Sequence, residues 1–192
     1  MRYVSVKEIQ EKLTSMILDS VINISEDCKI AIAGACKKET NRNARFALEI
    51  LQQNIAAASE YNIPPCQDTG MAVVFADIGQ DVVLEGMYIE DAINQAVRDA
   101  YRQSFRKSVL DPVTRINTAD NTPAVIHTRI VKGDSVSIYF LAKGFGSENM
   151  SKLYMLKPAD GIKGVKESVL STVKTAGGNP CPPVIVGVGI GG

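Results

Sequence analysis

The sequence lacks an excess of charge of either sign, although it is not poor in charged residues. Its 192 residues carry 21 Lys and Arg against 21 Asp and Glu, so the formal net charge at pH 7 is zero. This balance excludes the basic field that draws nucleic acid or an anionic membrane to a protein. A small anionic substrate remains compatible with it, because one or two cations in a cleft are enough to bind such a molecule.

Targeting and membrane signals are also absent. The first residues, MRYVSVKEIQEKL, have charges distributed through them and no apolar core followed by a cleavage site, so they are not a secretory signal. No apolar run approaches the roughly 20 residues of a membrane-spanning helix. We therefore expect a cytoplasmic protein. In that reducing compartment we interpret the four cysteines as thiols, metal ligands or catalytic groups rather than disulfides: Cys28, Cys36, Cys66 and Cys181.

No two cysteines have the CxxC spacing, which excludes the generic zinc and ferredoxin patterns. Two of them nevertheless lie among prolines, Cys66 in the segment IPPCQDTG and Cys181 in the segment NPCPP. Prolines stiffen both segments, and a rigid backbone around a thiol favours a metal site. The pattern alone leaves a second interpretation open. In it, IPPCQDTG is a simple tight turn, Asp68 caps backbone amides and Cys66 is a small buried hydrophobe.

The periodicity of apolar residues predicts an α+β fold rather than alternating βαβ units, with no internal repeat and no clear linker. Helical spacing early in the chain predicts three successive helices, and a proline-containing segment ends them. We expect the remaining elements to be a mixed or antiparallel sheet with a hairpin and flanking helices. The predicted ranges are helices within 5–60, a strand at 71–76, a helix at 89–107, strands at 124–131 and 135–141 about a turn at 132–134, a helix at 160–175 and a β-rich run at 183–190.

Four motifs occur in a defined order along the chain: PPCQDTG, the FRKS stretch that contains Arg106, KGFGSENMS, and NPCPP followed by GVGIGG. In this order and context they resemble the alpha subunits of class I, iron–sulfur fumarate hydratases, over residues 5–192. The alpha subunits of L-tartrate dehydratases carry similar motifs, so the resemblance identifies the family better than the substrate. By this resemblance, residues 1–192 form the N-terminal domain of such a subunit and stop before the site is complete.

The resemblance implies a 4Fe–4S cluster held by three cysteines, with Cys66 and Cys181 as two of the ligands and the third beyond residue 192. One iron without a protein thiolate would act as a Lewis acid in the interconversion of fumarate and L-malate. The resemblance also implies that Gln67 and Asp68 contact the substrate. Asp68 is in addition a candidate for proton transfer, or for orienting the group that performs it. We expect the Cys66 and Cys181 loops to converge on one cleft.

Arg106 falls in the helix predicted at 89–107, where a cation is usually solvated. The resemblance instead implies a paired contact between its guanidinium and a carboxylate of the substrate. Gly144 and Gly146 would let backbone amides approach that ligand closely. An ordinary turn from a strand into a helix, with Ser147 as its N-cap, is the alternative interpretation, and both can hold together.

Further expectations concern partners and rival functions. The resemblance implies a beta subunit or C-terminal domain that supplies the catalytic histidine and further cations, and we expect oligomerisation. His127, the sole histidine, is expected to be structural, as are Cys28 and Cys36. A rival function is nucleotide binding, because GVGIGG satisfies GxGxxG, although no helix or acidic residue follows it. A second rival is a non-catalytic module that binds a partner.

Overall fold

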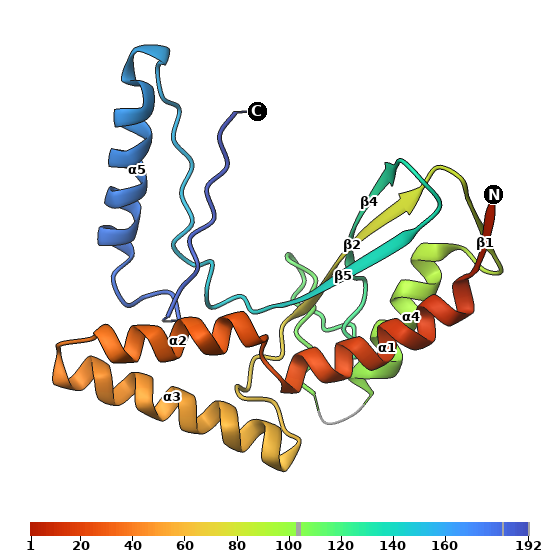
Figure 1. Cartoon of the computed structure of the whole chain (residues 1–192), viewed down its shortest axis with the longest axis horizontal. Coiled ribbons are helices and arrows are strands. Elements are labelled where there is room, and N and C mark those ends of the chain that lie inside the picture. The colour runs from red at the N-terminus through yellow and green to blue at the C-terminus, as the bar shows by residue number, and fades with distance from the viewer. Residues whose placement is uncertain (103–104, 182, 192) are drawn as a thin grey trace. The chain divides into compact units, whose positions relative to one another are not determined.

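The computed structural model describes residues 1–102, 105–181 and 183–191, and confirms the predicted α+β fold (Figure 1). The chain divides into two compact units, Met1–Lys143 and Gly144–Gly192, and each is described here by itself. The helices are α1 (Val6–Ile22), α2 (Glu26–Lys38), α3 (Arg42–Tyr61), α4 (Ile89–Tyr101), the short 3₁₀ helix η1 (Pro158–Asp160) and α5 (Gly161–Ala176). The strands are β1 (Arg2–Ser5), β2 (Met71–Gly79), β3 (Val82–Glu85), β4 (Val125–Val131) and β5 (Val136–Lys143).

The three helices predicted before residue 62 are confirmed as α1, α2 and α3. Polar side chains begin two of them, as the N-cap rule expects. The Ser5 hydroxyl accepts a hydrogen bond from the amide of Glu8, and the Asn41 side chain accepts from the amides of residues 43 and 44. The helices differ in burial, since α1 has five buried residues whereas α2 has none and α3 has only Ala58.

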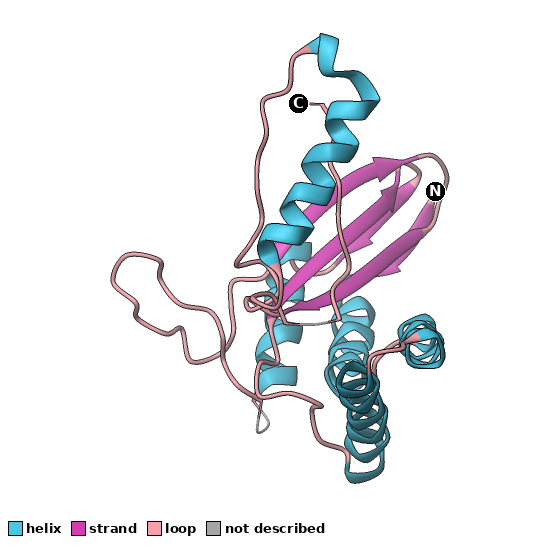
Figure 2. Ribbon diagram, turned by 90° about the vertical axis from the view of Figure 1, so that its left-hand side faces the viewer, coloured by secondary structure: helices cyan, strands magenta, loops and turns pink. Residues whose placement is uncertain are grey.

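The core of the first unit lies between a three-stranded sheet and the helices α1 and α4. Strand β2 is central, parallel to β4 and antiparallel to β5 (Figure 2). Because side chains alternate across a strand, Ala72 and Val74 point to the helices, while Phe75 is 42% exposed on the opposite face. Helix α4 contributes Ile93, Val97 and Tyr101 to this core, each 0% exposed.

The predicted hairpin needs a correction. A short turn does join β4 to β5, but the two strands are not neighbours, because β2 lies between them. Two strand spacings amount to roughly 10 Å, which a four-residue connection can cross. The turn passes over the end of β2, where the amide of Gly79 donates to the carbonyl of Ser135 and the amide of Asp81 donates to that of Gly133.

Two strands of the first unit were not predicted. Strands β1 and β3 have four residues each and pair in parallel with each other. Segments this short lie at the lower limit of strand length and carry too few residues for an alternation to be recognised.

The second unit contains one long helix and extended segments. Helix α5 ends at Gly177, whose φ is 54°, which confirms the glycine stop expected there. The expected β-rich run at 183–190 is wrong, because no strand is assigned within residues 183–191. Its apolar side chains are exposed, 89% for Ile185 and 78% for Ile190, and no described strand pairs with them. Among the described residues, no helix has the length and apolar character needed to cross a membrane.

Candidate functional site

The Cys66 loop begins where α3 ends. Asn62 adopts the left-handed conformation, with φ 54°, and ends the helix. The side-chain amide of Asn54, on α3, donates a hydrogen bond to the carbonyl of Pro65 at 2.7 Å. The prolines and this hydrogen bond hold the backbone ahead of Cys66. The Cys66 side chain is exposed, and its thiol contacts the side-chain oxygen of Gln67 at 3.4 Å. Among the four cysteines, all of which are described, none forms a disulfide.

Asp68 forms the turn cap considered in one interpretation of the loop. Its Oδ1 accepts from the amide of Gly70 at 3.0 Å and lies 3.4 Å from the hydroxyl of Ser108. Gly70 has a φ of 75°, and a Cβ at that position would lie 2.7 Å from the amide nitrogen of Lys143. The position therefore requires glycine. The expected contact of Asp68 with a substrate stays a prediction.

Arg106 does not lie in a helix, which corrects the predicted range of 89–107. Helix α4 ends at Tyr101, and residues 105–109 have no regular secondary structure. The carbonyl of Arg106 accepts a hydrogen bond from the hydroxyl of Thr69 at 2.8 Å. The side chain of Arg106 is exposed. Together with the contact between Asp68 and Ser108, this bond brings the PPCQDTG and FRKS motifs side by side.

Two buried side chains that were not predicted hold these motifs together. Asn121 is 0% exposed, its amide nitrogen donates to the carbonyl of Gly70 at 3.1 Å, and its Oδ1 accepts from the amide of Ser108 at 2.7 Å. The hydroxyl of Tyr101 donates to the carbonyl of Thr69 at 2.9 Å. Burial, with a smaller effect of the Asp68 carboxylate, raises the pKa of Tyr101, so its hydroxyl remains a donor at neutral pH.

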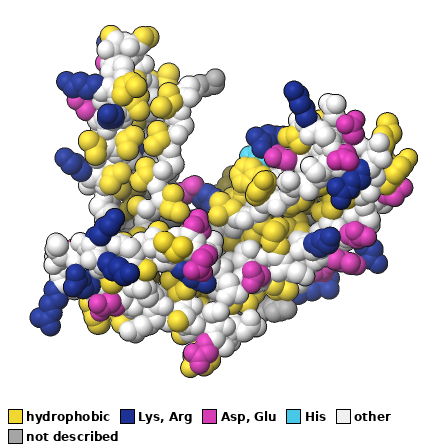
Figure 3. Space-filling model, in the orientation of Figure 1, with side chains coloured by type: hydrophobic (Ala, Val, Ile, Leu, Met, Phe, Trp, Pro, Cys, Tyr) yellow, Lys and Arg dark blue, Asp and Glu magenta, His cyan; other side chains and the backbone are white. Residues whose placement is uncertain are grey.

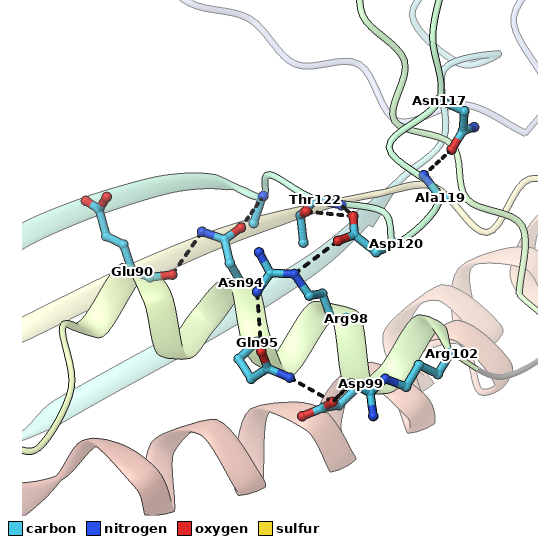
Figure 4. A network of polar contacts seen from close by, with 11 residues as sticks. Glu90, Asn94, Gln95, Arg98, Asp99, Arg102, Asn117, Ala119, Asp120 and Thr122 are labelled. Carbon is cyan, nitrogen blue, oxygen red and sulfur yellow. Dashed lines mark hydrogen bonds and ion pairs between the residues drawn. The ribbon is translucent and has the colours of Figure 1, made fainter.

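Helix α4 fixes the far end of the segment that carries Arg106 (Figure 4). The guanidinium of Arg98 donates to Asp120 at 3.0 Å, and the hydroxyl of Thr122 donates to the same carboxylate at 2.7 Å. Asn94 accepts from the amide of Ala124, where the chain enters β4. Burial acts to raise the pKa of Asp120, but hydrogen bonds from Thr122 and Arg98 outweigh it and leave that pKa below its usual range.

The second unit brings its own two motifs together. The amide of Cys181 donates to the carbonyl of Gly146 at 3.3 Å, and a Cβ at residue 146 would lie 2.9 Å from the sulfur of Cys181. The side-chain amide of Asn149 donates to the carbonyl of Asn179 at 2.8 Å. Gly146 therefore leaves room for a thiol. The alternative of a turn into a helix is half right, since Ser147 bonds back to the carbonyl of Gly144 but no helix begins there.

The other predicted residues lie as follows. His127 is on β4 and stacks on Phe75, with ring centroids 5.0 Å apart. Cys28 and Cys36 are half-buried on α2. The last glycine of the GxGxxG pattern, at position 192, is outside the described residues. Within the described part of the chain, no three side chains of His, Cys, Asp or Glu are grouped to hold a metal ion.

Comparison with known proteins places these motifs. The profile of fumarate hydratase (Fumerase) matches residues 10–192. A putative L(+)-tartrate dehydratase subunit alpha of Methanocaldococcus jannaschii is 38% identical in sequence to this chain. The alignment covers 96% of this chain and 67% of that protein. The L(+)-tartrate dehydratase subunits alpha of Escherichia coli K12 and Shigella sonnei are each 29% identical in sequence to this chain. Those alignments cover 93% of this chain and 62% of each relative.

These matches relate the chain to the alpha subunits of L(+)-tartrate dehydratases. The chain belongs to the fumarate hydratase (Fumerase) family.

Proposed function

We propose that this chain is part of a hydro-lyase that interconverts fumarate and L-malate. The observation that carries the proposal is the pair of contacts from Thr69 to the Arg106 carbonyl and from Asp68 to the Ser108 hydroxyl. They bring together two segments of the sequence, one with the Cys66 thiol and the Asp68 carboxylate and the other with Arg106. Family membership supports the same reaction class.

The chain's own groups suit a dicarboxylate. Arg106 would form a two-pronged contact with one substrate carboxylate, since a planar guanidinium matches that geometry. Gln67 would donate to the other polar end of the substrate, and the backbone at Gly146 would approach it closely. Dehydration removes a proton from the carbon next to the hydroxyl-bearing carbon while hydroxide leaves. Asp68 would accept that proton or orient the group that does.

The proposed cofactor is a 4Fe–4S cluster, with Cys66 and Cys181 as its ligands from this chain. The donor chemistry fits in part: both thiols are exposed, both lie among prolines, and thiolates are the usual ligands of such clusters. A third thiolate would come from outside residues 1–192. When bound, the cluster would supply a Lewis-acidic iron that assists the departure of hydroxide. We expect it to be absent or oxygen-labile in this chain alone.

Dehydration of L-tartrate is the second candidate, and the names of the similar alpha subunits favour it. Those names also support a beta subunit as the partner of this chain. The interface and the further residues of that partner would set the choice of substrate. A chain that only folds and binds its partner remains the non-catalytic alternative.

The test is anaerobic reconstitution with iron and sulfide, with and without the beta subunit, followed by absorption spectroscopy and assays with fumarate and with L-tartrate. We expect the cluster absorption and hydration activity only in the complete assembly, and their loss with Cys66→Ser or Cys181→Ser. A matched control, Cys36→Ser, should retain both. A cluster that is unaffected by Cys66→Ser would overturn the ligand assignment. Absence of activity on either substrate, with the cluster in place, would favour the non-catalytic alternative.

A further inference from the structure

Thr69 lies in the PPCQDTG motif, directly after Asp68, but its side chain faces the protein interior. Thr69 is 6% exposed, whereas Gln67 of the same motif is exposed. The Thr69 hydroxyl donates a hydrogen bond to the carbonyl of Arg106 at 2.8 Å. The Thr69 carbonyl accepts a hydrogen bond from the buried hydroxyl of Tyr101 at 2.9 Å. Because the side chain is buried and its hydroxyl already has a partner, we do not expect Thr69 to contact a substrate itself.

The backbone around Arg106 is held in place, although the Arg106 side chain is exposed. Phe105, the preceding residue, is 6% exposed and belongs to the hydrophobic core. On the other side, the amide of Ser108 donates to the buried side chain of Asn121 at 2.7 Å. The bond from Thr69 lies between these two anchors and acts on Arg106 itself. The exposed guanidinium therefore extends from a backbone position that the first unit defines.

Charge alone does not distinguish Arg106 from the other cations of the chain. The formal net charge is zero, and Lys and Arg side chains occur in several separate places on the face of the molecule shown in Figure 3. A single exposed cation contributes little attraction, because water and salt screen it. A two-pronged contact with a carboxylate depends on geometry, since two N–H groups have to meet two oxygens at the same time. The position of Arg106 therefore matters more than its charge.

The bond from Thr69 relates this position to the polar groups of the PPCQDTG motif. Asp68 precedes Thr69 by one residue, and Cys66 precedes it by three. The Asp68 carboxylate accepts from the amide of Gly70 at 3.0 Å, so it is held on the same turn as Thr69. A substrate carboxylate bound by Arg106 would thus lie at a set distance from Asp68. Such geometry has to be held within about 0.5 Å, and a misplacement of about 1 Å can cost roughly 100-fold in rate.

We propose that Thr69 is a positioning residue for substrate binding. Its hydroxyl holds the backbone from which the Arg106 side chain extends, and it acts on a dicarboxylate only through the Arg106 guanidinium. This inference rests on the proposed function, in which Arg106 binds one carboxylate of the substrate. It assigns part of the substrate affinity to a buried hydroxyl that does not touch the substrate.

Substitutions at Thr69 separate the hydroxyl from the methyl group. Thr69→Val removes the hydroxyl and keeps the β-branched shape. Thr69→Ala also removes the hydroxyl, without placing a methyl group against the Arg106 carbonyl, and serves if Thr69→Val does not fold. Thr69→Ser keeps the hydroxyl and loses the methyl group. The matched control is Thr14→Val on α1, because the Thr14 hydroxyl also donates to a backbone carbonyl, that of Gln10 at 2.9 Å.

The first measurement is the steady-state kinetics of each variant assembled anaerobically with iron, sulfide and the beta subunit. Thr69→Val should raise KM by about 10- to 100-fold and change kcat by less than about threefold, because Arg106 holds the carboxylate in the ground state and the transition state alike. A merely structural role would reduce the amount of folded enzyme, and so the apparent kcat, without changing KM. Thr69→Ser and Thr14→Val should keep KM within about threefold of the wild type.

A double-mutant cycle tests whether Thr69 acts through Arg106. Arg106→Lys keeps the positive charge but loses the two-pronged geometry, so the contact no longer depends on a fixed orientation. Adding Thr69→Val to Arg106→Lys should therefore raise KM by less than about threefold, although Thr69→Val alone raises it by about tenfold or more. Two effects that simply multiply would show that Thr69 does not act through the guanidinium, and would overturn the proposal.

Nuclear magnetic resonance relaxation of the full chain gives a measurement that does not need activity. The amide of Lys107 shares a peptide group with the Arg106 carbonyl, so it reports directly on the bond from Thr69. Its order parameter should be near the value of about 0.85 of a rigid backbone in the wild type and in Thr69→Ser, and should fall towards about 0.6 in Thr69→Val. A Lys107 amide that is equally ordered in the wild type and in Thr69→Val would overturn the inference, whatever the activity.

The kinetics also separate a failure of this inference from a failure of the proposed function. A wild-type assembly that holds its cluster but turns over neither fumarate nor L-tartrate would overturn the proposed function, and the role of Thr69 in substrate binding with it. An active wild type whose KM does not change with Thr69→Val or Thr69→Ala would overturn this inference alone. Partial unfolding of a variant does not obscure the comparison, because KM does not depend on how much of the protein is folded.

Discussion

Asn121 connects the two motifs of the first unit. One buried side chain satisfies both a carbonyl of the PPCQDTG motif and an amide of the FRKS motif. In the sequence it is one polar residue among several in a loop, and nothing in composition or spacing distinguishes it. Tyr101 looks like an ordinary apolar position of a helix. Sequence patterns report the periodicity of burial, whereas these two side chains act through hydrogen bonds formed only in the folded chain.

We therefore expect Asn121→Ala to lower the free energy of unfolding by about 2 to 4 kcal/mol, because it leaves buried backbone groups without a partner. Urea unfolding of the full chain measures this. Asn117→Ala is the matched control: it lies in the same loop and donates to the carbonyl of Lys107, but it is exposed, so its loss should be below about 1 kcal/mol. Equal losses for the two variants would contradict the role given to Asn121.

Arg106→Lys should leave stability unchanged, since the side chain is exposed and its structural bond uses the backbone carbonyl. In the assembled enzyme the same change should weaken substrate binding by about 2 to 5 kcal/mol, because lysine loses the two-pronged geometry. Measuring both kcat/KM and the unfolding midpoint of the variant separates the effect on substrate binding from the effect on stability. Arg115→Lys, also exposed, is the control. Unchanged kinetics would make Arg106 a surface cation.

Asp120 gives the first unit a predictable sensitivity to acid. Its pKa is lowered in the folded chain, so its contribution to stability is present above the pKa of about 4 of an unfolded carboxyl and is lost as the pH falls through the folded value. We expect Asp120→Asn to destabilise the chain at pH 7 and to match the wild type near pH 2. Urea unfolding midpoints of both proteins between pH 2 and pH 7 measure the difference in stability. A difference that does not depend on pH would exclude the carboxylate as its source.

At the scale of elements, helices were predictable and their connections were not. Long amphipathic periods locate α1, α3 and α4 because apolar residues recur along them at helical spacing. The placement of β4 and β5 on either side of β2 could not be read from the turn between them, because a short turn only limits the distance between two strands. In the same way, helical spacing up to residue 107 could not reveal that the carbonyl of Arg106 bonds to Thr69.

Gly79 is where the β4–β5 turn crosses the end of β2. A Cβ there would lie 2.4 Å from the carbonyl oxygen of Gly133, so Gly79→Ala should cost about 1 to 3 kcal/mol of stability. Gly34→Ala is the control. Nothing lies within 4 Å of a Cβ at that position on α2, and alanine should add up to about 1 kcal/mol there. Thermal unfolding of both variants measures the difference in stability. An alanine at position 79 that leaves stability unchanged would contradict the close approach of the β4–β5 turn to the end of β2.

At the scale of the whole molecule, the hydrophobic core formed by the described residues lies in the first unit. The second unit buries almost none of its apolar side chains, and an isolated helix of 16 residues is marginal in water. We expect a fragment of residues 1–143 to unfold cooperatively, and a fragment of residues 144–192 to lack a cooperative transition. Circular dichroism during heating tests both. A first fragment without a transition would show that its core needs the second unit.

The parallel pairing of β2 with β4 has a consequence for the order of events during synthesis. The anchor at Asn121 is made 51 positions after Gly70, the residue that it holds. A ribosome thus completes the Cys66 loop well before β4 exists to lie against β2, and closing so long a loop has an entropic cost that only later contacts offset. The nascent thiol loop therefore lacks its Asn121 anchor for part of translation. Any metal that requires the finished geometry has to be inserted after β4 has emerged.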